Sequence, residues 1–174
     1  NVQGGQDSRA NAIISVHTGS TSSWSEYPDI TIHQSLFSDN YMESQGATHA
    51  SIFEAGVPFS FHNNLVIENY AQSALTMIFT NSLPDQSGTS GSSYILNNTF
   101  YGNDGNSSFV DVAGDKEYVN ITNNIIWANN KGQNESSDFY IGNNATVYIN
   151  NNIFESGANG GTQVDNINDA PKLR

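Results

Sequence analysis

The segment ITNNIIWAN (121–129) is one of five copies of a short pattern that recurs along the chain. The other copies are IHQSLFSDN (32–40), FHNNLVIEN (61–69), ILNNTFYGN (95–103) and INNNIFESG (149–157). Successive copies begin about 26 to 34 residues apart, and each carries apolar residues at the same positions. A period of this size with constant apolar columns is typical of a solenoid, in which each copy forms one turn.

Aligned on their fourth residue, the copies share two apolar columns and two columns rich in asparagine. In a solenoid, the residues of one column lie above one another on neighbouring turns. The columns are Ile32, Phe61, Ile95, Ile121 and Ile149; Phe37, Val66, Phe100, Ile126 and Phe154; Ser35, Asn64, Asn98, Asn124 and Asn152; and Asn40, Asn69, Asn103, Asn129 and Gly157.

One copy also predicts the local structure of a turn of the solenoid. Apolar and polar residues alternate over 119–122, which indicates a strand with one buried face. Asn123 and Asn124 suit a corner, because asparagine tolerates left-handed backbone and bonds to nearby backbone groups. A second strand follows at 125–127, then a variable loop and a third strand at 138–141. The third strand of the other coils is expected at 12–16, 51–53, 75–79, 109–112 and 162–164.

We therefore expect one all-β domain over 1–174, with about five coils of three short parallel strands stacked ~4.8 Å apart. The coils are predicted near 12–40, 51–69, 75–103, 109–129 and 138–157, followed by a tail at 158–174. The polar ends offer only partial caps for the apolar interior. The chain is accordingly expected to be a segment of a longer β-helix or to associate end to end with copies of itself.

The first asparagine column is predicted to form an internal ladder. Stacked amides bond to the residues above and below, and so satisfy polar groups that are otherwise costly to bury. Its predicted members are Asn64, Asn98, Asn124 and Asn152.

The NNxFxxN-type repeat, with an IxI strand before it, resembles the right-handed parallel β-helix superfamily of the pectate-lyase-like fold. The resemblance covers roughly 30–154. It implies the fold, but the superfamily includes polysaccharide lyases, glycoside hydrolases, adhesins and other functions, so it does not assign an activity.

Charge and composition exclude several classes of partner. The chain has 5 Lys and Arg against 17 Asp and Glu, and a formal net charge of −12. Nucleic acids and anionic membranes bind clustered cations, so neither is an expected partner. No stretch approaches the ~18 apolar residues of a membrane span. We expect a secreted protein, extracellular or at the cell surface.

Loop lengths predict where a ligand binds. Long loops at 17–29 and 80–93 flank a short corner at 54–58. This arrangement predicts a small cleft with Glu54 at its floor and Trp24 and Tyr27 on one wall.

Two sets of polar residues are candidates for catalysis or metal binding. His33 and His62 share an outward column on adjacent coils, and with Glu54 they suit a divalent transition metal or a general base. Asp39 and Glu68 share another column and suit Ca²⁺, or an acid and nucleophile couple. Both sets also fit simple exposed side chains without a cofactor.

Aromatic residues are the candidates for sugar binding. Tyr94 and Tyr148 are expected to point outward on the first strand of their coils, and Trp127 on the second. With Trp24 and Tyr27 they suit stacking on sugar rings, although packing between coils is the alternative.

The leading expectation is a β-helix module that binds polysaccharide without catalysis. A polysaccharide lyase or glycoside hydrolase of this fold is the alternative, and a structural or adhesive stalk is the second. Lyases of the resembled fold use a basic residue beside acids, whereas the basic residues here fall outside the predicted cleft. They are Arg9, Lys116, Lys131, Lys172 and Arg174.

Overall fold

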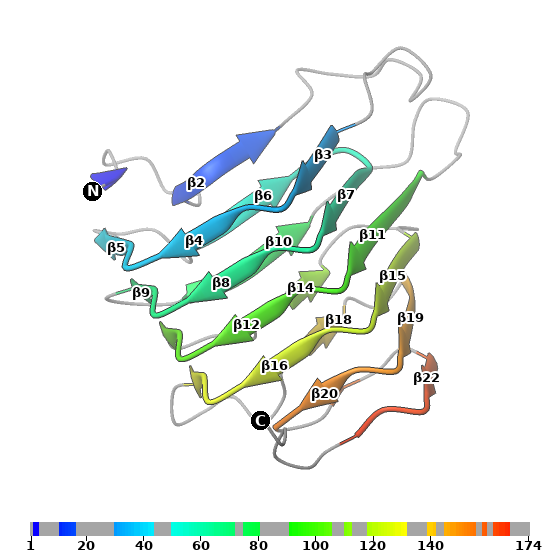
Figure 1. The fold of residues 1–174 in the computed structure, drawn as a ribbon. Coiled ribbons are helices and arrows are strands. Elements are labelled where there is room, and N and C mark those ends of the chain that lie inside the picture. The colour runs from blue at the N-terminus through cyan, green and yellow to red at the C-terminus, as the bar shows by residue number, and fades with distance from the viewer. Residues whose placement is uncertain are drawn as a thin grey trace.

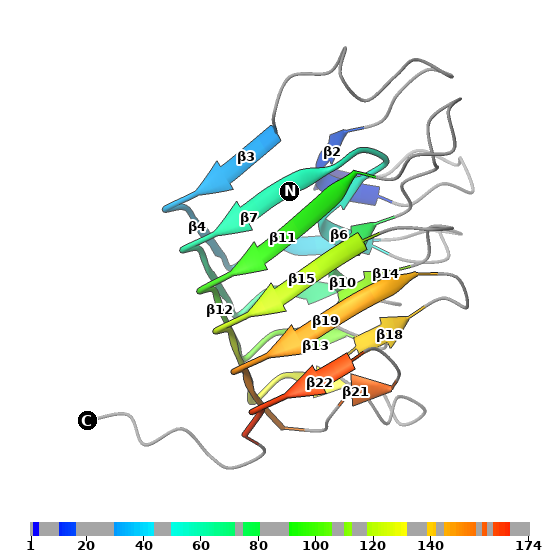
Figure 2. The same ribbon diagram turned by 90° about the vertical axis from the view of Figure 1, so that its right-hand side faces the viewer.

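The protein is described by a computed structural model, which defines residues 2–3, 11–16, 30–43, 50–71, 75–80, 91–105, 110–112, 118–131, 139–141, 145–155, 158–159 and 162–167. Within these residues every regular element is a β-strand, and the strands form four parallel sheets (Figures 1 and 2). In each sheet, neighbouring strands come from successive repeats of the sequence. We number the sheets 1 to 4 in the order in which one repeat passes through them.

Sheet 1 contains the first strand of each repeat, and Figure 2 shows these strands side by side. The period-two pattern predicted from sequence is present, because Val119 and Ile121 are fully buried while Tyr118 is exposed. The strands are β3 (Ile30–His33), β7 (Phe59–His62), β11 (Ser92–Leu96), β15 (Tyr118–Thr122), β19 (Thr146–Asn150) and β22 (Thr162–Val164).

Sheet 2 follows a sharp corner in each repeat. The residue before the ladder asparagine has left-handed backbone, for example Asn63 with φ 55° and Asn123 with φ 58°. Asparagine adopts this conformation more readily than most residues, which explains the paired asparagines of the sequence. The strands are β4 (Leu36–Ser38), β8 (Leu65–Ile67), β12 (Thr99–Tyr101), β16 (Ile125–Trp127) and β20 (Ile153–Phe154).

The predicted asparagine ladder is present at this corner. Asn98, which is 1% exposed, accepts the backbone N–H of Asn64 at its Oδ1 (2.9 Å). Its Nδ2 donates to the carbonyl of Phe61 (2.9 Å) and to Oδ1 of Asn124 (3.0 Å). The same bonds link Asn124 to Asn152 and Asn152 to Asn166. The ladder thus supplies partners for backbone groups at a buried corner where ordinary strand pairing is interrupted.

The expectation of three strands per repeat was wrong, because repeats also contribute a fourth short strand. This strand lies in sheet 3 and occupies part of the predicted variable loop. A second left-handed residue, such as Glu68 (φ 54°) or Gly102 (φ 65°), turns the chain into this strand. The second asparagine column, Asn40, Asn69, Asn103 and Asn129, forms another ladder there, with amide-to-amide bonds of 2.8 Å. The strands are β1 (Val2–Gln3), β5 (Tyr41–Glu43), β9 (Tyr70–Ala71), β13 (Asp104–Gly105) and β17 (Asn130–Lys131).

Sheet 4 contains the strand that was predicted third in each repeat. One assignment was wrong: 162–164 pairs with β19 in sheet 1, because Asp165 (φ 52°) and Asn166 repeat the first corner beyond it. The predicted tail therefore contains two further strands. The strands of sheet 4 are β2 (Asn11–Val16), β6 (Ala50–Ala55), β10 (Leu75–Thr80), β14 (Val110–Val112), β18 (Phe139–Ile141) and β21 (Ala158–Asn159).

The apolar columns form the core between the sheets. Phe61 is fully buried, and its ring centroid lies 5.9 Å from that of Phe37 and 6.3 Å from that of Phe100. Phe53 of sheet 4 packs on the same ring at 5.8 Å. Residues of the two apolar columns thus contact each other between successive repeats, so each repeat completes the burial of its neighbour.

Candidate functional site

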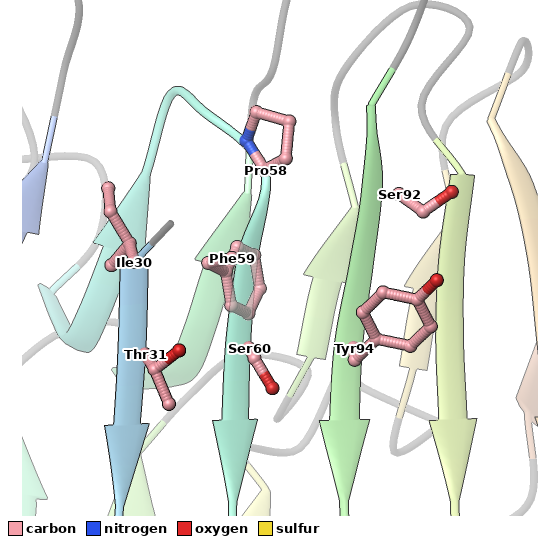
Figure 3. A pocket seen from close by; sticks show the side chains of 7 residues that line it. All are labelled: Ile30, Thr31, Pro58, Phe59, Ser60, Ser92 and Tyr94. Carbon is pink, nitrogen blue, oxygen red and sulfur yellow. The ribbon is translucent and has the colours of Figure 1, made fainter. Parts of the chain in front are cut away.

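A pocket opens on the outer surface of sheet 1, near the starts of β3, β7 and β11 (Figure 3). Its volume is about 260 Å³. The described residues that line it are Ile30, Thr31, Pro58, Phe59, Ser60, Ser92 and Tyr94.

Strand register explains the hollow. Thr31, Ser60 and Tyr94 occupy equivalent positions on three consecutive strands. Two small side chains beside a large one leave space above the sheet, and the Tyr94 ring forms one wall of it. Gly91 lies against Pro58, since a Cβ atom at Gly91 would be 2.8 Å from the Pro58 Cβ and closer still to its Cγ. Only glycine fits this position without a shift of the proline.

The pocket lies where β3, β7 and β11 begin, beside the short corner at 54–58 that the sequence analysis placed between two long loops. Residues 17–29 and 81–90 of those predicted loops lie outside the described part of the chain. The composition of the pocket differs from the prediction in one respect. Glu54 does not line it, but lies in β6 of sheet 4, where it is largely buried. Trp24 and Tyr27 fall outside the described residues.

Beyond the pocket, the outer surface of sheet 1 carries further exposed tyrosines. Tyr94, Tyr118 and Tyr148 are 41%, 45% and 42% exposed. Tyr94 and Tyr148 share one row across the strands, with Asn120 of β15 between them. We call this surface the tyrosine face; its outward residues include Thr31, Ser60, Ser92, Tyr94, Tyr118, Asn120, Thr146 and Tyr148.

Tyr118 was missed in the sequence analysis. The available signal was its position two residues before Asn120, which places it on the outer side of the same strand. Tyr118 lies in register with Ser92 and Thr146, so it forms the next row along the face. On β11, β15 and β19, large and small residues therefore alternate both along and across the strands.

The two histidines meet as predicted from their column. His33 and His62 are in register, and their rings stack with centroids 5.2 Å apart and planes 13° from parallel. Nδ1 of His62 is 2.9 Å from the side-chain nitrogen of Asn63. Parallel rings direct their in-plane nitrogen lone pairs side by side, whereas a shared metal ion needs lone pairs that converge on one point.

The remaining metal candidates lie elsewhere. Glu54 belongs to a different sheet from the histidines, and Asp39 and Glu68 are exposed corner residues with φ 55° and 54°. Within the described part of the chain, no three His, Asp or Glu side chains come together as a metal site would require.

The predicted sugar-binding aromatics fall on two surfaces. Tyr94 and Tyr148 lie on the tyrosine face, whereas Trp127 lies on sheet 2, in register with Tyr101 and half-buried. We call the outer surface of sheet 2 the aliphatic face; its residues include Leu36, Leu65, Ile67, Tyr101, Ile125, Trp127 and Ile153.

Comparison of the chain with protein-family models, curated proteins and solved structures gave no match. Within the described residues, no helix is present that is long and apolar enough to cross a membrane. The function is therefore inferred from the chemistry of the pocket and the tyrosine face.

Proposed function

We propose that the protein is a right-handed parallel β-helix, a solenoid resembling the pectate-lyase-like fold, and that its tyrosine face binds polysaccharide without catalysis. Four stacked parallel sheets that each take one strand per repeat support the fold assignment, as do the buried asparagine ladders. An extracellular or cell-surface location is part of the proposal, since structural polysaccharides are chiefly found there.

The observation that carries the proposal is the pocket lined by hydroxyl and apolar groups, which continues into exposed tyrosines. Thr31, Ser60 and Ser92 offer hydroxyls that both donate and accept hydrogen bonds. Pro58, Phe59 and the ring of Tyr94 offer apolar surface beside them. A sugar presents the complementary combination of hydroxyl groups at its rim and C–H groups on its ring faces. Apolar surface with a few convergent polar groups is the usual composition of a small-molecule pocket.

The same lining supports binding rather than chemistry. Glycoside cleavage uses a pair of positioned acid and base groups. The described lining contributes a single titratable side chain, the Tyr94 phenol, and its other polar groups are hydroxyls. These groups orient and hold a ligand.

A pair of matched variants tests the proposal. Tyr94→Ala removes the pocket wall, and Tyr101→Ala removes an equally exposed tyrosine (42%) from the aliphatic face of the same repeat. We expect Tyr94→Ala to lower affinity for a bound polysaccharide about tenfold, the equivalent of ~1.4 kcal/mol, and Tyr101→Ala to leave it unchanged. Affinity electrophoresis against a panel of neutral and acidic polysaccharides measures both. Equal affinities of the two variants would refute the proposal. A lack of retardation of the unmodified protein by every polysaccharide in the panel would refute it as well.

A further inference from the structure

The spacing of Tyr94 and Tyr148 adds information about the ligand. They occupy the same register position on β11 and β19, and β15 lies between these strands. Two strand spacings place their Cα atoms roughly 10 Å apart. The two tyrosines therefore occupy equivalent exposed positions, aligned with the direction in which the repeats stack.

This spacing matches one class of glycan. In an extended β-1,4-linked chain, successive sugars are turned over, so the same ring face returns at every second sugar. That two-sugar repeat is close to two strand spacings. Helical α-1,4-linked glucans curve away from a straight line and do not hold this repeat.

The residues around the two tyrosines also fit a glycan that lies across the strands. The row that crosses the strands runs from Thr31 through Ser60, Tyr94 and Asn120 to Tyr148. Stacking platforms thus alternate with groups that form hydrogen bonds to sugar hydroxyls. Every described member of this row is uncharged, and the chain has a net charge of −12, which repels polyuronates.

We infer that the tyrosine face takes a neutral, extended β-1,4-linked glycan that lies across the strands, with alternate sugars on Tyr94 and Tyr148. This inference rests on the proposed function and specifies the ligand of the same surface. The pocket beside Tyr94 holds one end of the bound segment, and Tyr148 holds a sugar two units away.

Calorimetric titration with β-1,4-linked gluco-oligosaccharides tests it. A disaccharide reaches one platform and a hexasaccharide reaches both, so we expect the hexasaccharide to bind about tenfold more tightly. Tyr148→Ala should abolish this gain, whereas Tyr101→Ala should preserve it. Thermal unfolding of each variant checks that these exposed substitutions leave the fold intact.

Three outcomes would overturn the inference. An undiminished gain in Tyr148→Ala would show that the glycan does not cross the strands to that ring. Tighter binding of an α-1,4-linked gluco-hexasaccharide or of an oligogalacturonate would refute the ligand class and leave the proposed function standing. No binding of any of these glycans or of the polysaccharide panel would refute the inference and the proposed function together.

Discussion

The tyrosine face and the aliphatic face belong to adjacent sheets of the same repeats, yet their outward residues differ in kind. On sheet 1, tyrosines alternate with small polar residues and leave a pocket. On sheet 2, Leu, Ile and aromatic residues occupy most positions of the outward rows, and Leu36 is 62% exposed. Inward columns are similar on both sheets. The stack therefore constrains the inward residues, and the outward residues are where binding chemistry can differ.

The inward columns should give the largest effects on stability. Phe61→Ala removes a fully buried ring that contacts three other phenylalanines, so we expect a loss of about 3–5 kcal/mol in the free energy of unfolding. Urea denaturation followed by circular dichroism measures it. A loss below 1 kcal/mol would contradict the assigned core.

The asparagine ladder should give the next largest loss in the free energy of unfolding. Asn98→Ala leaves the Asn64 N–H and the Phe61 carbonyl without their side-chain partners at a buried corner, and we expect a loss of roughly 3 kcal/mol. Asn97→Gly is the matched control, because the neighbouring residue is exposed and has φ 56°, which glycine adopts freely. The same denaturation experiment should give the control a change within about 0.5 kcal/mol. Equal effects at both positions would argue against the ladder.

A substitution at Gly91 tests the part of the pocket wall that Pro58 forms. Gly91→Ala places a methyl group against Pro58, and we expect a loss of about 1–3 kcal/mol in stability together with weaker glycan binding. Calorimetry and thermal unfolding of one preparation give both values. Unchanged binding would mean that Pro58 can move without consequence for the ligand.

The smallest effects should come from the aliphatic face. Leu36→Ala truncates a side chain that is mostly in solvent at the first strand of sheet 2, so both stability and glycan affinity should remain within about 0.5 kcal/mol of the original protein. A clear loss of glycan affinity in this variant would move the binding surface from sheet 1 to sheet 2.

The sequence predicted the parts of the structure that repeat. Constant columns such as Ile95 and Asn98 placed the buried strands and the first ladder, because burial imposes the same demand on every copy. The strands of sheet 3 were missed, since two or three residues are too few to show a period of two. Residues 162–164 were placed in the wrong sheet because their corner carries Asp165 in place of asparagine.

For the site, loop lengths indicated the corner but not its lining. Glu54 was expected at the floor from its place in the chain, yet its side chain belongs to sheet 4. The hollow at Ser60 arises from side-chain sizes on three strands, which become neighbours only once the register is known. Sequence spacing alone does not supply that register to within one residue.

The most direct test of the central claim is a crystal structure of the protein with a bound β-1,4-linked gluco-hexasaccharide. The account predicts density for sugar rings over Tyr94 and Tyr148, with the chain crossing β11, β15 and β19. Sugar density over Leu65 and Trp127 on the aliphatic face, or a ligand lying along a single strand, would contradict it.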